Sequence, residues 1–284
     1  MALIPDKSSQ TRRVLRLRAG QAPVEEEDLL AVEEPLEIRV AGDPLAVTMR
    51  TPGADHRLAL GYLYAEGIIR SSADVGTVAH CGRPGEEGYG NVIDVTPAPG
   101  AKLETERVRT ATRGTLTTSA CGVCGRRSVD DLLDLCGALP DGPVLPVDLV
   151  AGAPEVLSES QRLFERTGGV HAAGAFSEAG ELLCAFEDVG RHNAVDKVVG
   201  ALVLRGLGTG AADAPKPALL MVSGRASFEI VQKAAMARIP VVASVSAGSS
   251  LAAALAERLN LTLVTFVRPG GLQVTTGRAR IRTL

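Results

Sequence analysis

The sequence predicts an α/β fold for its second half, joined to a smaller α+β part at the N-terminal side. Short apolar runs at 218–222, 241–245 and 261–267 have the length of buried strands. Stretches with a helical spacing of apolar residues separate them, and 284 residues suffice for one large domain or two small ones. Continuous apolar runs joined by helices are typical of a parallel sheet covered by helices on both faces.

The N-terminal third reads as two pieces. Residues 1–30 are first basic and then acidic, so we expect a poorly ordered arm. Residues 31–105 are expected to form a small α+β subdomain. Alternating apolar residues predict a hairpin over 34–49, and a helix over 55–67 follows, before weaker strand and loop signals.

Residues 106–284 are expected to form the larger subdomain, in which helical and strand patterns alternate. The expected elements are a helix over 154–166 with Pro154 at its start, strands over 171–176 and 182–186, a helix capped by Asn193 and ending at Gly206, a strand over 218–222, a helix over 227–238, a strand over 241–245, a helix over 250–259 and a strand over 261–267. No internal repeat is found in the sequence.

Composition and charge exclude several classes of protein. The chain is 45% hydrophobic and 22% charged, as in ordinary soluble domains, and its net charge of −3 argues against a bulk nucleic-acid binder. No apolar run approaches the ~20 residues that span a membrane, and the start lacks the apolar core of a signal peptide. We therefore expect a cytoplasmic protein without nucleic-acid or membrane partners, in which five cysteines do not form a disulfide framework.

The most distinctive motif is a pair of cysteines, Cys121 and Cys124, separated by Gly-Val. A Thr/Ser-rich stretch before the pair predicts a mobile loop, and the pattern after it predicts a helix with Ser128 as its N-cap. A helix N-terminus and the neighbouring Arg126 and Arg127 both stabilise a thiolate over a thiol. The pair is therefore a candidate for sulfur, redox or metal chemistry.

The surrounding residues weaken three interpretations of this pair. A structural zinc site needs four ligands, but Cys81, Cys136 and Cys184 are scattered and no second close pair exists. A thioredoxin-like motif would follow a strand directly. A zinc deaminase needs a His-x-Glu motif before its Pro-Cys-x-x-Cys, and neither is present. An activated thiolate on a carrier loop, which can hold sulfur as a persulfide, fits best, and no metal site is expected.

Three glycine- or serine-rich segments lie where predicted strands end. They contain Ser223 with Arg225, residues 246–250, and the stretch Phe266, Val267, Arg268, Pro269, Gly270 and Gly271. Ligands of such sheets bind at the carboxyl ends of strands, and small residues, backbone N–H groups and arginines suit phosphates. None of the three is a Walker A or GxGxxG sequence, so tight turns and capping account for them equally well.

Two histidines carry open interpretations. His192 lies in a polar cluster with Arg191, Asn193, Asp196 and Lys197, which is either capping with a salt bridge or an anion- or thiol-assisting site. His171 lies among small residues and is either a core histidine with satisfied hydrogen bonds or a functional one.

The sequence resembles the FdhD family over about residues 30–280. The resemblance rests on long ordered blocks at 118–125, 169–174, 187–197 and 223–233, together with 34–40, 58–62 and 66–69. Members of this family are accessory sulfurtransferases of formate dehydrogenase. The resemblance implies that sulfur is taken from a cysteine desulfurase and inserted into the molybdenum cofactor, in its bis(molybdopterin guanine dinucleotide) form.

The resemblance also implies a fold similar to that of cytidine deaminases without zinc, with a mixed sheet and helices on both faces, and a homodimer. Residue by residue, it makes Cys121 the persulfide carrier, with Cys124 assisting, and places the cofactor stretch on Phe266 to Gly271. GDP would be a mimic of the bound nucleotide. Gly248 and residues 272–276 depart from the usual family pattern, which leaves the contacts of this tail open.

We therefore expect a sulfurtransferase in which Arg225 and Arg268 meet the cofactor diphosphates by bidentate pairing. Two other classes stay open at this stage. One is a dithiol oxidoreductase that cycles a Cys121–Cys124 disulfide. The other is a non-catalytic chaperone that binds the cofactor and docks it on the dehydrogenase.

Overall fold

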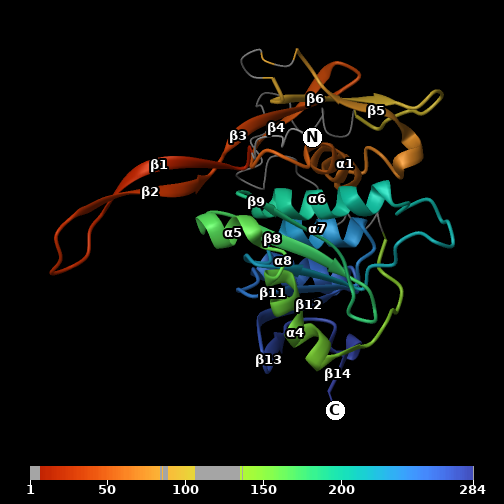
Figure 1. The fold of residues 1–284 in the computed structure, drawn as a ribbon. Coiled ribbons are helices and arrows are strands. Elements are labelled where there is room, and N and C mark those ends of the chain that lie inside the picture. Colours follow the sequence, from red (N-terminus) through yellow and green to blue (C-terminus); the bar gives the residue numbers. More distant parts are fainter. Residues whose placement is uncertain (1–6, 84, 86–88, 106–134, 136, 284) are drawn as a thin grey trace.

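The computed structural model describes residues 7–83, 85, 89–105, 135 and 137–283 (Figure 1). A smaller sheet with one helix lies above a larger sheet with its helices, and a two-stranded arm projects to one side. Among the described residues no helix is long and apolar enough to cross a lipid bilayer.

The smaller sheet contains the predicted hairpin. Its strands are β3 (Glu34–Val40), β4 (Asp43–Arg50), β5 (Val75–His80) and β6 (Val92–Pro97), in the order β4-β3-β6-β5. β3 pairs antiparallel with β4 and parallel with β6. The alternating Leu36, Ile38 and Val40 are buried in the core that they share with α1 (Asp55–Ala65), so both the hairpin and the helix are confirmed.

The larger sheet is mixed, as expected. Its strands are β8 (His171–Phe176), β9 (Leu182–Asp188), β10 (Leu219–Val222), β11 (Val241–Ser244), β12 (Thr262–Arg268) and β13 (Gly271–Val274), in the order β13-β12-β11-β10-β8-β9. Only β10, β11 and β12 are parallel to one another, while β8, β9 and β13 each pair antiparallel with a neighbour. The similarity to cytidine deaminases stays a prediction.

Helices cover both faces of this sheet, and the strand residues divide between them with period two. Leu220 and Val242 face the core shared with α6 (Arg191–Leu204), α7 (Phe228–Met236) and α8 (Ser250–Arg258). Leu219 and Val241 face a second core with α4 (Val147–Ser158). The short elements are α5 (Arg162–Thr167), η1 (Ser72–Asp74), η2 (Arg278–Arg280), β7 (Leu145–Pro146) and β14 (Ile281–Arg282).

The two parts of the molecule meet where α1 crosses α6, and two glycines allow the contact. A β-carbon built on Gly61 would lie 1.8 Å from the carbonyl oxygen of Asp196, and one on Gly200 would lie 1.8 Å from that of Arg57. The two helix backbones therefore touch directly. One continuous core extends from Ile38 in the small sheet to Leu263 in the large one, whereas the predicted domain boundary at residue 105 stays a prediction.

Two helix starts differ from the sequence prediction. Pro154 was expected to begin a helix, but α4 begins at Val147 and contains Pro154, and α5 is a separate helix. Burial of Val150 and Leu157 against the sheet decides the position of α4, although the proline removes one helical hydrogen bond.

Asn193 was expected to cap α6, but Gly190 is the cap residue and Asn193 lies inside the first turn. Its side-chain amide donates instead to the carbonyl of Met49, which belongs to β4. The side chain of Asn193, which the local sequence pattern assigns to capping, therefore bonds to a residue that is distant in sequence.

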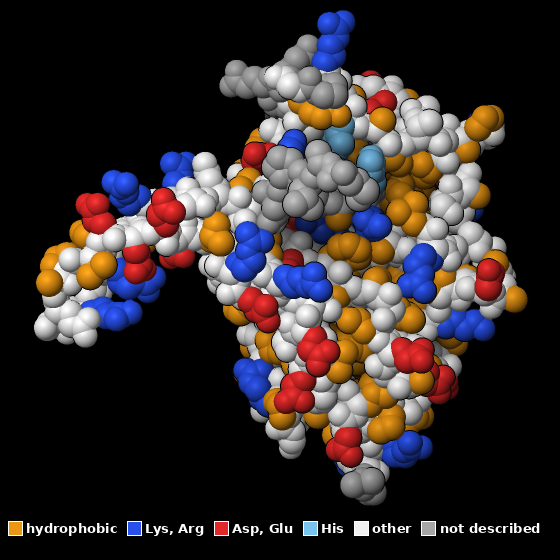
Figure 2. All heavy atoms as spheres, viewed as in Figure 1, with side chains coloured by type: hydrophobic (Ala, Val, Ile, Leu, Met, Phe, Trp, Pro, Cys, Tyr) orange, Lys and Arg blue, Asp and Glu red, His pale blue; other side chains and the backbone are white. Residues whose placement is uncertain are grey.

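The N-terminal arm is a correction to the expectation of poor order. β1 (Ser9–Arg16) and β2 (Val24–Ala31) form an antiparallel hairpin in which the basic strand faces the acidic one. Arg16 pairs with Glu26 and Asp28. The basic and acidic runs, which are typical of a solvated tail, therefore form ion pairs across the two strands of this hairpin. Figure 2 shows the arm projecting from the body, with hydrophobic side chains near its outer end. Leu17, which directly follows β1, is 68% exposed.

Substitution of either crossing glycine by alanine tests the direct contact of α1 with α6. Gly61→Ala and Gly200→Ala would each force a β-carbon into a backbone carbonyl, so we expect a loss of roughly 3 kcal/mol or more in the free energy of unfolding. Gly152→Ala in α4 is the matched control, because nothing lies within 4 Å of its β-carbon position. Urea denaturation measures all three, and equal stability of Gly61→Ala and Gly152→Ala would contradict the close crossing.

Candidate functional site

The three predicted strand-end segments come together at one edge of the large sheet. Ala226, after β10, forms a parallel bridge with Gly248, after β11. The backbone N–H of Phe266, near the end of β12, donates to the carbonyl of Ser246 at 3.1 Å. The neighbouring carboxyl ends of β10, β11 and β12 therefore form a single edge that includes Ser223 and Arg225.

The stretch from Phe266 to Gly271 divides into parts with different roles. Val267 is fully buried in the core, whereas Phe266 is 46% exposed and has a left-handed backbone, with φ of 51°. The guanidinium of Arg268 donates to the carbonyls of Val245 and Val267, which holds this arginine against the sheet edge. The turn from β12 into β13 consists of Pro269 and Gly270, and Gly271 is the first residue of β13.

β8 brings His171 to the same edge, because this strand runs antiparallel to β10. A β-carbon built on Gly224 would lie 3.2 Å from His171 Nδ1 and 3.4 Å from Arg191 Cδ, so both side chains close over Gly224. Burial, and then the charges of Arg191 and Arg225, hold the pKa of His171 below its usual value, while Asp188 acts in the opposite direction. His171 therefore belongs to the strand-end edge, which the sequence left undecided.

A buried ion pair fixes the junction between β9 and α6. Lys197 Nζ lies 2.6 Å from a carboxylate oxygen of Asp188, and both side chains are almost completely buried. The other carboxylate oxygen of Asp188 accepts from Gly190 N and Asn193 Nδ2, and Lys197 also donates to the carbonyl of Thr51. Burial raises the pKa of Asp188, and the adjacent Lys197 opposes that rise. The sequence predicts a salt bridge in this cluster, and Lys197 does form one, but its partner is Asp188, which is not among the residues of the predicted cluster.

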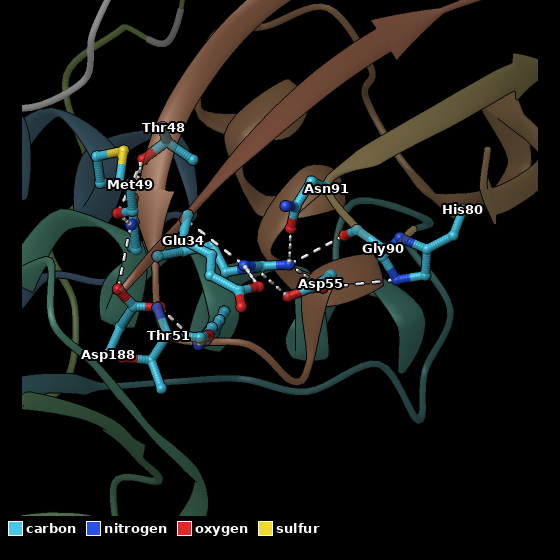
Figure 3. Close-up of polar contacts among 12 residues, drawn as sticks. Glu34, Thr48, Met49, Thr51, Asp55, His80, Gly90, Asn91 and Asp188 are labelled. Carbon is cyan, nitrogen blue, oxygen red and sulfur yellow. Dashed lines mark hydrogen bonds and ion pairs between the residues drawn. The ribbon is translucent and has the colours of Figure 1, made fainter. Parts of the chain in front are cut away.

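The end of β4 clamps this junction from the smaller sheet (Figure 3). Thr51 donates its backbone N–H to Asp188, and its hydroxyl accepts from Val189 N. Thr48 donates its hydroxyl to the side-chain oxygen of Asn193 at 3.0 Å. The sequence pattern predicts no role for either threonine. The available signal at Thr48 is a polar residue at an inward-facing position of an alternating strand, whereas Thr51 lies just after the end of β4.

Arg50 lies between these two threonines in sequence and binds a separate set of partners. Its guanidinium donates to Asp55 and to the carbonyl of Gly90, and it also pairs with Glu34 (Figure 3). This buried arginine anchors β4 to the start of α1, which holds the clamping residues in place.

His192 belongs to a second polar cluster, between α6 and α7. Its Nε2 lies 3.0 Å from both Ser227 Oγ and Glu229 Oε2. Burial, and then the positive charges of Lys233 and Arg191, lower the pKa of His192 to about 3, so the imidazole is neutral at pH 7. Lys233 Nζ also lies 2.7 Å from Asp196, whose pKa burial raises to about 6.

The predicted catalytic pair, Cys121 and Cys124, lies outside the described residues, as do Arg126, Arg127, Ser128 and Cys136. Described residues on either side of this segment lie beside the end of α1. Glu104 N donates to the carbonyl of Ile68, and a β-carbon built on Gly67 would lie 3.1 Å from Leu135 Cδ2. The chain therefore leaves and re-enters the described structure at the same place.

The two described cysteines are free thiols with different surroundings. Burial raises the pKa of Cys184 to about 11, so this thiol is protonated and unreactive at neutral pH. Cys81 is partly exposed. Within the described ranges no three His, Cys, Asp or Glu side chains converge as metal ligands would.

Comparison with known proteins identifies the family. The model of the FdhD/NarQ family matches residues 31–282. The chain belongs to the FdhD/NarQ family. Curated relatives named "Sulfur carrier protein FdhD" include one from Anaeromyxobacter dehalogenans, 58% identical over 89% of this chain and 88% of its own. Another, from Streptomyces coelicolor, is 46% identical over 96% and 95% of the two chains.

A solved structure shares the fold of this FdhD/NarQ family member. It is the crystal structure of a protein from Desulfotalea psychrophila, described as a candidate formate dehydrogenase accessory protein. It superposes with a TM-score of 0.72 at 26% identity and covers 96% of this chain and 99% of its own. The arrangement of sheets described above is therefore shared with this protein.

Removal of Lys197 tests the buried ion pair. Lys197→Met leaves the Asp188 carboxylate buried without its partner, so we expect a loss of about 3–5 kcal/mol in the free energy of unfolding. Lys216→Met, at an exposed loop position, is the control and should change stability by less than about 0.5 kcal/mol. The double variant Asp188→Asn/Lys197→Met should lose less than the sum of the single losses, and strict additivity in denaturation experiments would refute the coupling.

A second prediction concerns pH. In the unfolded chain His192 binds a proton near pH 6.5, whereas its pKa in the folded protein is about 3. The unfolded state therefore binds more protons between these values, and this histidine makes stability fall as pH drops from about 6.5 towards 3.

We expect the thermal midpoint of His192→Gln to depend less steeply on pH than that of the parent in this window. Burial raises the pKa of Asp196 and Glu229, which acts in the opposite direction, so the difference between parent and variant is the quantity to measure. Parallel pH profiles of the two proteins would contradict the burial of a neutral imidazole.

Proposed function

We propose that this protein is a sulfur carrier that supplies sulfur to the molybdenum cofactor of formate dehydrogenase. The observation that carries the proposal is the family match together with curated sulfur-carrier relatives that cover most of the chain. The Cys121–Cys124 pair supplies the nucleophilic thiol that such a carrier needs. The donor is a cysteine desulfurase, which presents sulfur as a persulfide.

Loading of the carrier is an exchange between sulfur atoms. The thiolate of Cys121 attacks the outer sulfur of the desulfurase persulfide and forms a new S–S bond, while the old S–S bond breaks and the desulfurase cysteine leaves as a thiolate. One S–S bond forms and one breaks, so the step needs no oxidant. Arg126 and Arg127 are close in sequence and favour the attacking thiolate.

Release of the sulfur as sulfide requires two electrons. We propose that the thiolate of Cys124 supplies them by attacking the inner sulfur of the Cys121 persulfide. The carried sulfur then leaves as hydrosulfide towards the cofactor, and a Cys121–Cys124 disulfide remains. A cellular dithiol reductant returns the pair to its reduced form before the next cycle.

The acceptor is the bis(molybdopterin guanine dinucleotide) form of the cofactor, and we propose that it binds at the carboxyl edge of β10, β11 and β12. Phe266 offers an exposed aromatic ring for a base or pterin, and Arg225 offers an exposed guanidinium for a diphosphate. Ser223 and the turn through Pro269 and Gly270 border the same edge. GDP would bind there as a mimic of the nucleotide part, and the protein would act as a homodimer in the cytoplasm.

Persulfide loading is the direct test. Incubation with a cysteine desulfurase and labelled cysteine should add a mass of about 32 Da, one sulfur atom, to Cys121, as mass spectrometry of digested protein would show. Cys121→Ser should take no label. Cys184→Ala is the matched control and should load like the parent, because its buried thiol is protonated.

Two results would replace the proposal by another class of function. Loss of two hydrogens from the cysteine pair, with no labelled sulfur on Cys121 and no labelled sulfide released into solution, would indicate a dithiol oxidoreductase, because the proposed release step forms the same disulfide only while it expels labelled sulfide. Full activation of formate dehydrogenase by Cys121→Ala would indicate a chaperone that only docks the cofactor.

A further inference from the structure

We propose that His171, Arg191 and Arg225 form a phosphate-binding cradle around Gly224, and that this cradle holds the diphosphate of the guanine nucleotide. The inference rests on the proposed function for the identity of the nucleotide. It adds Arg191 and His171 to the site and moves the main diphosphate contact away from Arg268, whose guanidinium already donates to two backbone carbonyls.

Three elements that are far apart in sequence converge at this point. His171 begins β8, Arg191 begins α6, and Arg225 follows β10. The β-carbon position of Gly224 lies 3.2 Å from the His171 ring and 3.4 Å from Arg191 Cδ, so a larger residue would push into both side chains. A glycine here leaves backbone and side-chain donors close together, as sites for phosphate require.

The cradle contains a buried donor that no described residue uses. Arg191 Nε is buried and has no hydrogen-bond partner among the described residues. Of the two nearby carboxylates, Asp188 pairs with Lys197 at 2.6 Å. Glu229 lies 3.0 Å from the neutral His192, and its charge also attracts Arg191, but it forms no hydrogen bond with Arg191 Nε. A buried guanidinium nitrogen without a partner is costly, and a bound anion would satisfy it.

The remaining groups of the cradle also favour an anion. Gly190 caps α6 without any side chain to accept the first-turn N–H groups, so the positive end of this 14-residue helix is available. The Ser223 hydroxyl accepts a bond from Ala172 N at 2.9 Å and keeps its own proton to donate. Arg191 and Arg225 both act to lower the pKa of His171, which reflects the same positive field.

A diphosphate matches these donors better than a carboxylate does. Guanidinium groups pair with phosphate oxygens in bidentate geometry, and two arginines with an imidazole supply enough donors for two phosphate groups. Arg225 is exposed, so the cradle opens to solvent and can admit the diphosphate of a larger molecule. Phe266 lies at the same sheet edge and would be left to contact an aromatic ring of that molecule.

Calorimetric titration of the full chain with GDP and with guanosine tests the cradle. Arg191→Gln, Arg225→Gln and His171→Asn should each weaken GDP binding, the arginine variants by about tenfold or more, with guanosine binding unchanged. Arg205→Gln is the matched control, because it removes one exposed arginine from the opposite end of α6. Arg191→Lys keeps the charge and should retain part of the affinity even if Arg191→Gln folds poorly.

Two results of this titration would contradict the proposed cradle. GDP affinities of Arg191→Gln and Arg225→Gln equal to the parent, or parent affinities equal for GDP and guanosine, would rule it out. Sulfur loading on Cys121 in the same preparations separates the two proposals. If the variants load sulfur normally and bind GDP like the parent, the cradle is wrong and the sulfur-carrier proposal stands. If sulfur loading is absent but the variants lose GDP affinity as expected, the sulfur-carrier proposal is wrong and the cradle stands. A parent that binds no GDP at millimolar concentration would exclude the cradle together with the proposed cofactor edge.

Discussion

The direct contact between the backbones of α1 and α6 is the constraint on which the rest of the structure depends. Gly61 and Gly200 bring the two helices together so closely that the small and large sheets share one core. α6 begins at the strand-end edge, so its position relative to α1 also fixes where Arg191 lies. The packing of two helices in the interior thus decides the geometry of the proposed site at one end of the sheet.

Buried polar contacts make that geometry specific. The Asp188–Lys197 pair and the threonines of β4 join three elements through directional bonds, which an apolar interface of the same size would not supply. Such pairs contribute little net stability, because desolvation offsets most of their attraction. Here they favour one register between β4, β9 and α6.

The sequence predicts the parallel strands and the meeting of the segments that follow them well, because their signals are local. Apolar runs such as 219–222 have a clear length, and glycine and serine mark their ends. The failures come from partners that are distant in sequence. Asn193 bonds to Met49, and Thr51 bonds to Asp188, 137 residues away, so neither contact leaves a pattern in its own neighbourhood. The hairpin of the arm leaves no local signal either, because the pairing of its basic and acidic runs is visible only when the two strands are aligned. The close approach of His171 and Arg191 to Gly224 also leaves no local signal, because it arises only where three separate elements converge.

Phe266 holds a left-handed backbone that costs an aromatic residue of order 1–3 kcal/mol. Its N–H bond to Ser246 and the bonds of the neighbouring Arg268 hold this conformation in the free protein. The free energy of folding therefore supports this strained conformation, and the ring is already in place for the cofactor that we propose to bind there. A glycine at position 266 would adopt this backbone conformation without strain, but it would lack the aromatic ring. Under the proposed function, position 266 is thus one where selection for a stable chain and selection for a rigid binding surface act in opposite directions.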